Sequence, residues 1–225
     1  MAFMIKAIIF DMDGLLIDSE PIWFRAKQEL MKTLNLEWTH EDQIATMGVP
    51  TQFWIDYLYK KVNGILTKDE LLHGVTDRMI NLYKKGEIEL MPGVKEALKL
   101  AKENYKVGLA TGSYKQLMEI SLDINNWRNI FDVILSSDDL ERGKPFPDIY
   151  LEVMKRLNVK PKESVVLEDS RDGIKAGVAA EANVIAIPSK EVEVPKDVLN
   201  SATFVIDSLN EFPEVLNKLN NKNES

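Results

Sequence analysis

The sequence predicts an α/β fold in which helices cover a parallel sheet, with a helical subdomain inserted into the sheet domain. Three observations lead to this prediction. Short apolar runs bounded by turn residues recur along the chain, and helical patterns separate the later ones. One long stretch after the first run contains helical patterns alone. Alternation of strands and helices is typical of a parallel sheet with helices on both faces.

Each apolar run is short enough to be a strand that is buried on both faces. The expected strands are Ile5–Phe10, Lys106–Ala110, Val133–Leu135, Val165–Leu167, Val184–Ile187 and Phe204–Ile206. Among the helical patterns, Gly93–Asn104 follows Pro92, and Val94, Leu98 and Ala101 share one face at helical spacing. The same spacing predicts the helices Tyr114–Leu122, Pro147–Leu157 and Asp172–Ala180.

The stretch Ser19–Lys85 lies where a simple crossover would need only about a dozen residues. Its clearest helical patterns are Ser19–Leu34, Gln52–Lys61 and Lys68–Lys85. We therefore expect a helical cap at 19–86 and a sheet core made of 1–18 and 87–225, with hinges at Leu15–Ser19 and Gly86–Met91. The polar tail LNKLNNKNES is expected to fray.

Composition limits the classes of partner. The chain has 225 residues and a formal net charge of -8, which argues against nucleic acid or an anionic membrane as a partner. It has no cysteine, which suits a reducing compartment, and no apolar stretch approaches the roughly 20 residues of a membrane span. The N-terminus lacks a signal-peptide pattern. We expect a cytoplasmic monomer.

Polar side chains follow four of the expected strands, and the carboxyl ends of parallel strands meet at one edge of a sheet. In chain order these residues are Asp11 and Asp13, then Thr111, Gly112 and Ser113, then Lys144, then Glu168 and Asp169. The four carboxylates form an oxygen-rich set that suits Mg²⁺. The hydroxyl, the amides that begin the next helix and the lysine suit an anion. A metal beside anion donors is the usual arrangement for phosphoryl transfer.

In this order, the segments DMDG, ATGS, GKPFPD and LEDSRDGIKAG resemble the four motifs of the haloacid dehalogenase superfamily, in the subgroup with a helical cap after the first motif. The chain looks most like sugar phosphatases of the hexitol-phosphate and 2-deoxyglucose-6-phosphate type. β-Phosphoglucomutase and pseudouridine 5′-phosphatase are near relatives. The resemblance implies a Rossmann-like core, Mg²⁺ as cofactor and a small phosphorylated metabolite as substrate.

The resemblance also implies roles for individual residues. Asp11 would attack phosphorus and form an aspartyl-phosphate, and Asp13 would protonate the leaving oxygen and then deprotonate water. Thr111 and Lys144 would hold the phosphoryl oxygens. Asp169 would bind Mg²⁺ together with Asp11 and the backbone carbonyl of Asp13, and Glu168 would bind it directly or through water.

Each motif also has a simpler interpretation. An Asp-x-Asp sequence alone is more often a turn or a cap, and a lysine before proline is more often solvated. We expect Ser113 to act mainly as a helix cap or a secondary phosphate contact, and Ser170 and Arg171 to begin a helix. The cap aromatics are expected to form its small core, with an aromatic facing the substrate as the less favoured alternative. They are Trp23, Phe24, Trp38, Phe53, Trp54 and Tyr57.

Alternative functions remain open at this point. A mutase needs basic cap residues for a second phosphate, and the mutases that this chain resembles carry histidine where Trp23 stands and arginine near Thr51–Gln52. Arg25 and Arg78 are the remaining candidates for that charge. A nucleotide or pseudouridine 5′-phosphatase is a second alternative, and a non-catalytic phospho-ligand binding protein is a third. Because all the motif residues are present, hydrolysis is favoured.

Overall fold

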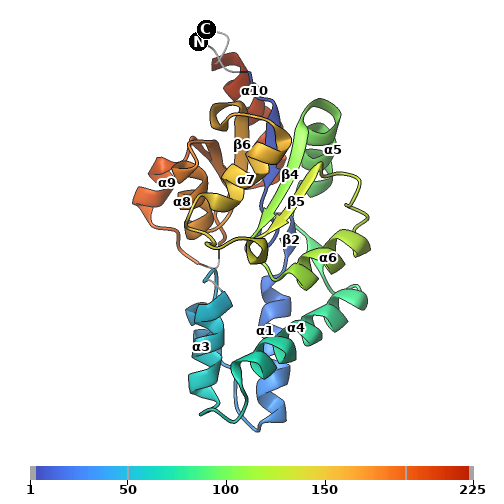
Figure 1. Cartoon of the computed structure of the whole chain (residues 1–225), viewed down its shortest axis with the longest axis vertical. Helices are drawn as coiled ribbons and strands as arrows, with labels where there is room; N and C mark the ends of the chain where they lie inside the picture. The colour runs from blue at the N-terminus through green and yellow to red at the C-terminus, as the bar shows by residue number, and fades with distance from the viewer. Residues whose placement is uncertain (1–3, 50, 191, 223–225) are drawn as a thin grey trace.

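The structure, a computed structural model, describes residues 4–49, 51–190 and 192–222. Its main sheet has six parallel strands in the order β5-β4-β1-β6-β7-β8 (Figure 1), so the prediction of a parallel sheet is confirmed. The strands are β1 (Ala7–Phe10), β4 (Lys106–Thr111), β5 (Val133–Ser136), β6 (Ser164–Glu168), β7 (Asn183–Ala186) and β8 (Phe204–Val205). The strand order reverses at β1, and ligands of open parallel sheets bind at such a point.

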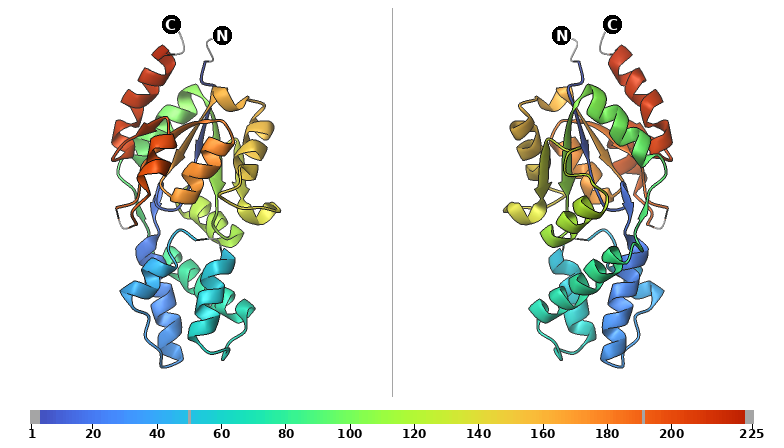
Figure 2. Two further views of the ribbon diagram at one scale, coloured as in Figure 1. Left: turned by 90° about the vertical axis from the view of Figure 1, so that its left-hand side faces the viewer. Right: turned by 90° about the vertical axis from the view of Figure 1, so that its right-hand side faces the viewer.

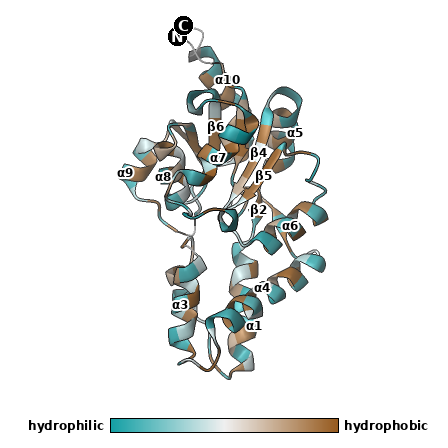
Figure 3. Cartoon of the chain, in the orientation of Figure 1, coloured by the Kyte–Doolittle hydropathy of each residue, from teal (hydrophilic) through white to brown (hydrophobic). Residues whose placement is uncertain are grey.

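Helices cover both faces of this sheet (Figure 2). One face carries α5 (Val94–Asn104), α6 (Lys115–Ile124) and α10 (Phe212–Lys222), and the other carries α7 (Asp148–Leu157), α8 (Arg171–Ala179) and α9 (Lys196–Ser201). Alternate side chains of β1 supply the two apolar cores: Ile8 and Phe10 belong to one, Ala7 and Ile9 to the other. The strands are accordingly the most continuously apolar elements of the sheet domain (Figure 3).

In the residues that the structure describes, the inserted segment forms four helices at one end of the molecule, away from both termini (Figure 1). They are α1 (Glu20–Thr33), α2 (His40–Ala45), α3 (Thr51–Lys61) and α4 (Lys68–Lys84). Capping boxes begin α2 and α4, where Thr39 and Thr67 accept hydrogen bonds from backbone amides three residues later. Two short strands, β2 (Ile17–Asp18) and β3 (Glu89–Leu90), pair antiparallel where the chain enters and leaves these helices. None of the described helices is long and apolar enough to cross a bilayer.

Several elements differ from the sequence prediction. The expected hinges contain β2 and β3, and the short helices α2 and α9 were not predicted, nor were the 3₁₀ turns Ser137–Asp139, Pro161–Glu163 and Leu209–Glu211. The expectation of a fraying tail is wrong as far as Lys222, because Val215, Leu216 and Leu219 bury one face of α10 in the core. Residues 223–225 of that tail lie outside the described residues. The domain boundaries at 18/19 and 86/87 stay a prediction.

Candidate active site

The loop after β1 presents two carboxylates at the carboxyl end of the sheet. Asp11 is buried, and its amide donates to Leu167 O, so the backbone still follows the β1–β6 ladder at this residue. Gly14 has φ +75°, and its amide donates to Ile17 O, which closes a tight turn behind Asp13. A Cβ at Gly14 would lie 2.1 Å from Asp169 Oδ2, so only glycine lets this turn approach the carboxylate.

Asp13 is held by the hydroxyls that follow β4. Ser113 Oγ donates to Asp13 Oδ2 at 2.5 Å, Thr111 Oγ1 lies 3.3 Å from the same oxygen, and Thr111 Oγ1 accepts from the Ser113 amide. The prediction of Ser113 as a helix cap is wrong, because Tyr114 is the residue at the N-cap of α6 and the Ser113 hydroxyl is engaged with Asp13. The residues expected to bind phosphate therefore also orient the expected proton donor.

Lys144 lies between two buried carboxylates. It follows the 3₁₀ turn after β5, and its Nζ is 2.5 Å from Asp11 Oδ1, 2.5 Å from Glu168 Oε1 and 3.1 Å from Ala110 O. Its side chain is only 10% exposed, so the interpretation as a solvated loop lysine is excluded. Burial disfavours its charge, but Asp11 and Glu168 outweigh this effect and raise the pKa of Lys144 well above its usual value.

Glu168 and Asp169 end β6 and precede α8. Glu168 is fully buried, and its carboxylate accepts from Lys144, from the Tyr150 hydroxyl and from Ser170. Ser170 caps α8 by accepting from the Gly173 amide, so the expectation that it begins a helix is confirmed. An added Cβ at Gly173 would lie about 2 Å from the Glu168 carboxylate, so the glycine leaves the space that this carboxylate fills.

Asp11, Glu168 and Asp169 each offer one carboxylate oxygen, and these oxygens lie within 4.8 Å of one another. Octahedral Mg²⁺ binds at about 2.1 Å, so its ligand oxygens stand about 3 to 4 Å apart, and small side-chain adjustments would bring this set to the ion. Burial also makes the set need a cation, since each of these carboxylates is at most 9% exposed. The residues present fit Mg²⁺. The side chain of Asp13 is not part of this cluster.

The crowded carboxylates shift one another's proton affinity. Burial, together with the charges of Glu168 and Asp13, raises the pKa of Asp11 to about 8, although Lys144 lowers it. Burial and the charge of Asp11 also raise the pKa of Asp169 well above its usual range. Without a divalent ion, Asp11 and Asp169 therefore keep their protons to a higher pH than unperturbed aspartates do, and a divalent ion would favour loss of these protons.

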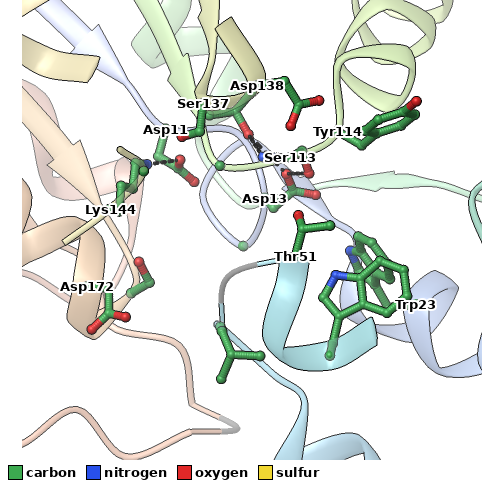
Figure 4. Close-up of a pocket in the computed structure, with 18 of the residues that line it drawn as sticks. Asp11, Asp13, Trp23, Thr51, Ser113, Tyr114, Ser137, Asp138, Lys144 and Asp172 are labelled. Carbon is green, nitrogen blue, oxygen red and sulfur yellow. Dashed lines mark hydrogen bonds and ion pairs between the residues drawn. The ribbon is translucent and has the colours of Figure 1, made fainter. Parts of the chain in front are cut away.

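A cavity of about 430 Å³ opens above these residues and is closed on its far side by the cap. Figure 4 shows Asp11 beside Lys144 and Asp13 beside Ser113, with Trp23 and Thr51 of the cap facing them. Two buried polar atoms of the lining, Asp13 Oδ1 and Ser137 Oγ, have no hydrogen-bond partner among the described residues. Unsatisfied buried polar atoms are costly unless a ligand supplies partners, so they support a ligand site here.

Some residues at the cavity were not anticipated from the sequence. Trp23 and Trp54 line the cavity, so the less favoured alternative, cap aromatics that face the site, applies to these two residues. Trp38 is buried, and Phe53 is 68% exposed. Lys27 also lines the cavity and is 1% exposed. The sequence contains a signal for Lys27, because a lysine among the apolar residues of one helix face is unusual.

The two arginines considered as cap cations lie elsewhere. Arg25 binds Glu29 and Glu87, Arg78 donates to Gly74 O, and neither is among the residues described as lining the cavity. Tyr150, which donates to Glu168, was also not anticipated, because it lies within α7 and outside the four motifs.

Comparison with known proteins finds a family model and related proteins that match most of this chain. The family model described as "Haloacid dehalogenase-like hydrolase" matches residues 8–187. Hexitol phosphatase B of Escherichia coli K12 is 37% identical over 193 residues, which cover 84% of this chain and 86% of that protein. The phosphorylated carbohydrates phosphatase of Thermotoga maritima is 35% identical over 179 residues, covering 78% and 81%.

Solved structures give the same fold. A putative beta-phosphoglucomutase from Thermotoga maritima matches with a TM-score of 0.79 and 29% identity, covering 95% of this chain and 99% of that one. CbbY from Rhodobacter sphaeroides in complex with phosphate matches with a TM-score of 0.79 and 28% identity, covering 93% and 96%. The relatives named as phosphatases support a phosphoric monoester hydrolase. The chain thus belongs to the haloacid dehalogenase-like hydrolase family.

Proposed function

We propose that this protein is a Mg²⁺-dependent phosphatase that hydrolyses the phosphate ester of a small sugar or polyol through an aspartyl-phosphate on Asp11. The observation that carries the proposal is the pairing of Asp11 with Lys144 beside two further buried carboxylates, under a cavity large enough for a small metabolite. The names of the phosphatase relatives supply the substrate class.

The first step is attack of an Asp11 carboxylate oxygen on phosphorus. The new P–O bond to Asp11 forms as the ester P–O bond breaks, and Asp13 gives its proton to the leaving sugar oxygen. In the second step, Asp13 takes a proton from water, the water oxygen bonds to phosphorus and the P–O bond to Asp11 breaks. Inorganic phosphate leaves and both aspartates return to their starting states.

The surrounding residues position these groups. Ser113 and Thr111 hold one oxygen of Asp13, which leaves Asp13 Oδ1 for the leaving group or the water. Lys144, Thr111 and the amide of Gly112 would hold the phosphoryl oxygens as charge moves onto them. Mg²⁺, held by Asp11, Glu168, Asp169 and the Asp13 carbonyl, would supply charge neutralisation at the phosphoryl group.

A phosphosugar mutase is the second candidate, because structures related at 29% identity include a putative beta-phosphoglucomutase. A mutase must grip a second phosphate with cap cations. Among the described residues that line the cavity, the cap contributes Lys27 as a cation and Glu20 as an anion, so the charges balance there. This balance favours hydrolysis of a monophosphate. The cytoplasmic location and the monomeric state stay predictions.

The test is a panel of phosphorylated sugars, polyols and nucleotides, including pseudouridine 5′-phosphate and β-glucose 1-phosphate with a bisphosphate activator. Phosphate release and isomer formation are measured side by side with Mg²⁺. We expect phosphate release from sugar or polyol phosphates, and a loss of more than about a thousandfold in Asp11→Asn. Asp197→Asn, at an exposed site on α9, is the matched control. Isomer formation without phosphate release would favour the mutase, and turnover that survives Asp11→Asn would refute the mechanism.

A further inference from the structure

Lys27 is a buried cation in the cap wall of the cavity, and the reaction described above does not use it. It lies on α1, is 1% exposed and lines the cavity. Burying an ammonium group is costly unless it finds partners, so a lysine at this place in a small helical cap requires an explanation.

The ammonium group is positioned by a hydroxyl and by aromatic faces. Its Nζ donates to Thr46 Oγ1 at 2.9 Å, and the ring centroids of Trp23, Trp38 and Trp54 lie 5.2, 5.5 and 5.9 Å away. Thr46 Oγ1 in turn lies within hydrogen-bond distance of two backbone carbonyls of α2, so the acceptor is itself fixed. An ammonium has three N–H donors, and Thr46 takes one of them.

Glu20 belongs to the same wall. It lies on the same helix two turns before Lys27, lines the cavity and accepts a hydrogen bond from the Gln43 side chain at 2.8 Å. Its charge acts on Lys27, since burial lowers the pKa of Lys27 to about 8 while Glu20 raises it. The cap wall therefore combines a fixed donor and a fixed acceptor with opposite charges.

This combination suits hydroxyl groups, which both donate and accept hydrogen bonds. A second phosphate would meet the Glu20 carboxylate as well as the Lys27 ammonium, and like charges repel. The indoles of Trp23 and Trp54, which also line the cavity, offer apolar surface for the C–H faces of a carbon chain. The wall is complementary to a neutral polyhydroxy chain.

We propose that Lys27, held on Thr46 among three tryptophans, acts with Glu20 to determine specificity by binding hydroxyl groups at the end of the substrate far from the phosphate. The protein then prefers monophosphates of neutral sugars or polyols to bisphosphates. This inference rests on the proposed function, and it assigns to two cap residues the recognition that the strand-end residues do not provide.

The test compares three substrates in Lys27→Met and Glu20→Gln: the most rapidly hydrolysed hexose or hexitol monophosphate, fructose 1,6-bisphosphate and p-nitrophenyl phosphate. In Lys27→Met, we expect kcat/KM for the sugar monophosphate to fall about tenfold more than kcat/KM for the aryl phosphate, mainly through KM. Lys32→Met, at an exposed site on the same helix, is the matched control and should leave both values unchanged.

The preference for bisphosphate over monophosphate is a second measurement, and it should change in opposite directions in the two variants. Removing the carboxylate leaves the cap wall positive, so Glu20→Gln should raise the preference for bisphosphate over monophosphate severalfold. Removing the ammonium leaves the wall negative, so Lys27→Met should lower that preference. A merely structural role would not move the ratio in opposite directions, and the comparison within each variant is independent of how much active protein folds.

The outcomes separate the two proposals. Hydrolysis of p-nitrophenyl phosphate with no turnover of any sugar or polyol phosphate by the wild type would overturn both. Turnover of sugar phosphates by the wild type, with ratios that both variants leave unshifted, would overturn this inference alone. Opposite shifts of the bisphosphate preference would support it.

Discussion

Gly173→Ala places a methyl group inside the space that the Glu168 carboxylate occupies. The added Cβ would lie 1.9 Å from Glu168 Cδ and 2.0 Å from each carboxylate oxygen. Non-bonded carbon atoms approach to about 3.5 Å, so the carboxylate must move by about 1.5 Å. Glu168 is fully buried and fixed by Lys144, Tyr150 and Ser170, so no such movement leaves all its hydrogen bonds intact.

The size of the effect follows from these bonds. A hydrogen bond to a charged group contributes about 2 kcal/mol, so losing two of the bonds to Glu168 costs about 4 kcal/mol. Replacing glycine by alanine in a helix offsets about 1 kcal/mol of that cost. We expect Gly173→Ala to lower the free energy of unfolding by about 3 kcal/mol, and to weaken Mg²⁺ binding at least about tenfold because a carboxylate of the proposed Mg²⁺ site is displaced.

Urea unfolding followed by circular dichroism measures the first quantity, and titration calorimetry with Mg²⁺ measures the second. Lys175→Ala, at an exposed site on the same helix, is the control and should change stability by less than about 0.5 kcal/mol. The sharper test is a double-mutant cycle with Glu168→Asp, which withdraws the carboxylate by about one bond length, 1.5 Å. In that background, Gly173→Ala should cost far less than in the wild type.

Two results would refute this reasoning. One is a neutral or stabilising Gly173→Ala, which would mean that helix propensity outweighs the contact with Glu168. The other is an equal cost of Gly173→Ala beside glutamate and beside aspartate, which would mean that the damage does not pass through the carboxylate at all.

Three further predictions concern other charged groups. Lys144→Met leaves two buried carboxylates without their shared cation and should cost about 3 to 5 kcal/mol in urea unfolding. Although burial opposes it, hydrogen bonds led by that from Lys61 lower the pKa of Asp42 to about 2, so Asp42→Asn should cost about 2 kcal/mol at pH 7. Because this contribution is lost as pH falls from about 4 toward 2, the difference from the wild type should shrink in urea unfolding at pH 3. Asp169→Asn should weaken Mg²⁺ binding in calorimetry at least about tenfold, whereas Asp13→Asn should lower kcat and leave Mg²⁺ affinity nearly unchanged.

The sequence was sufficient to predict the strand-end residues because parallel pairing places them together. Phe10 pairs with Leu109 on one side and with Leu167 on the other. Asp11 follows Phe10 and Glu168 follows Leu167, so the same pairing of β1 with β6 brings Asp11 beside Glu168. A correct assignment of the strands thus predicts this contact without any knowledge of the loops.

The cap could not be predicted in the same way, because its helices pack by side-chain shape and not by a repeating ladder. The helical spacing predicted α1, but not that the Lys27 ammonium would turn inward onto Thr46. The short helix α2, which supplies the backbone partners of Thr46, was not predicted at all. Sequence periodicity predicts which face of a helix is buried, but it does not predict which residues of two packed helices contact each other.

Asp11 links the stability of the protein to pH and to Mg²⁺. Its pKa is raised to about 8 in the folded protein by burial and by the charges of Glu168 and Asp13, while an unfolded aspartate titrates near 4. Between these values the folded state binds more protons than the unfolded state, so this group lowers stability as pH rises from about 4 through 8. Asp11→Asn removes the titrating carboxyl group, and therefore also removes this loss of stability at higher pH.

In the presence of a chelator, the stability of Asp11→Asn relative to the wild type should therefore increase with pH, by at most about 1.4 kcal/mol per pH unit, and level off above pH 8. Mg²⁺ favours the ionised carboxylate, so its binding should release a proton below pH 8 in the wild type. Thermal unfolding at several pH values measures the first effect, and calorimetry in buffers of different ionisation enthalpy measures the second. Parallel stability curves for the two proteins, or an equal heat of Mg²⁺ binding in every buffer, would mean that Asp11 is already ionised beside Lys144 and that the lysine alone neutralises the site.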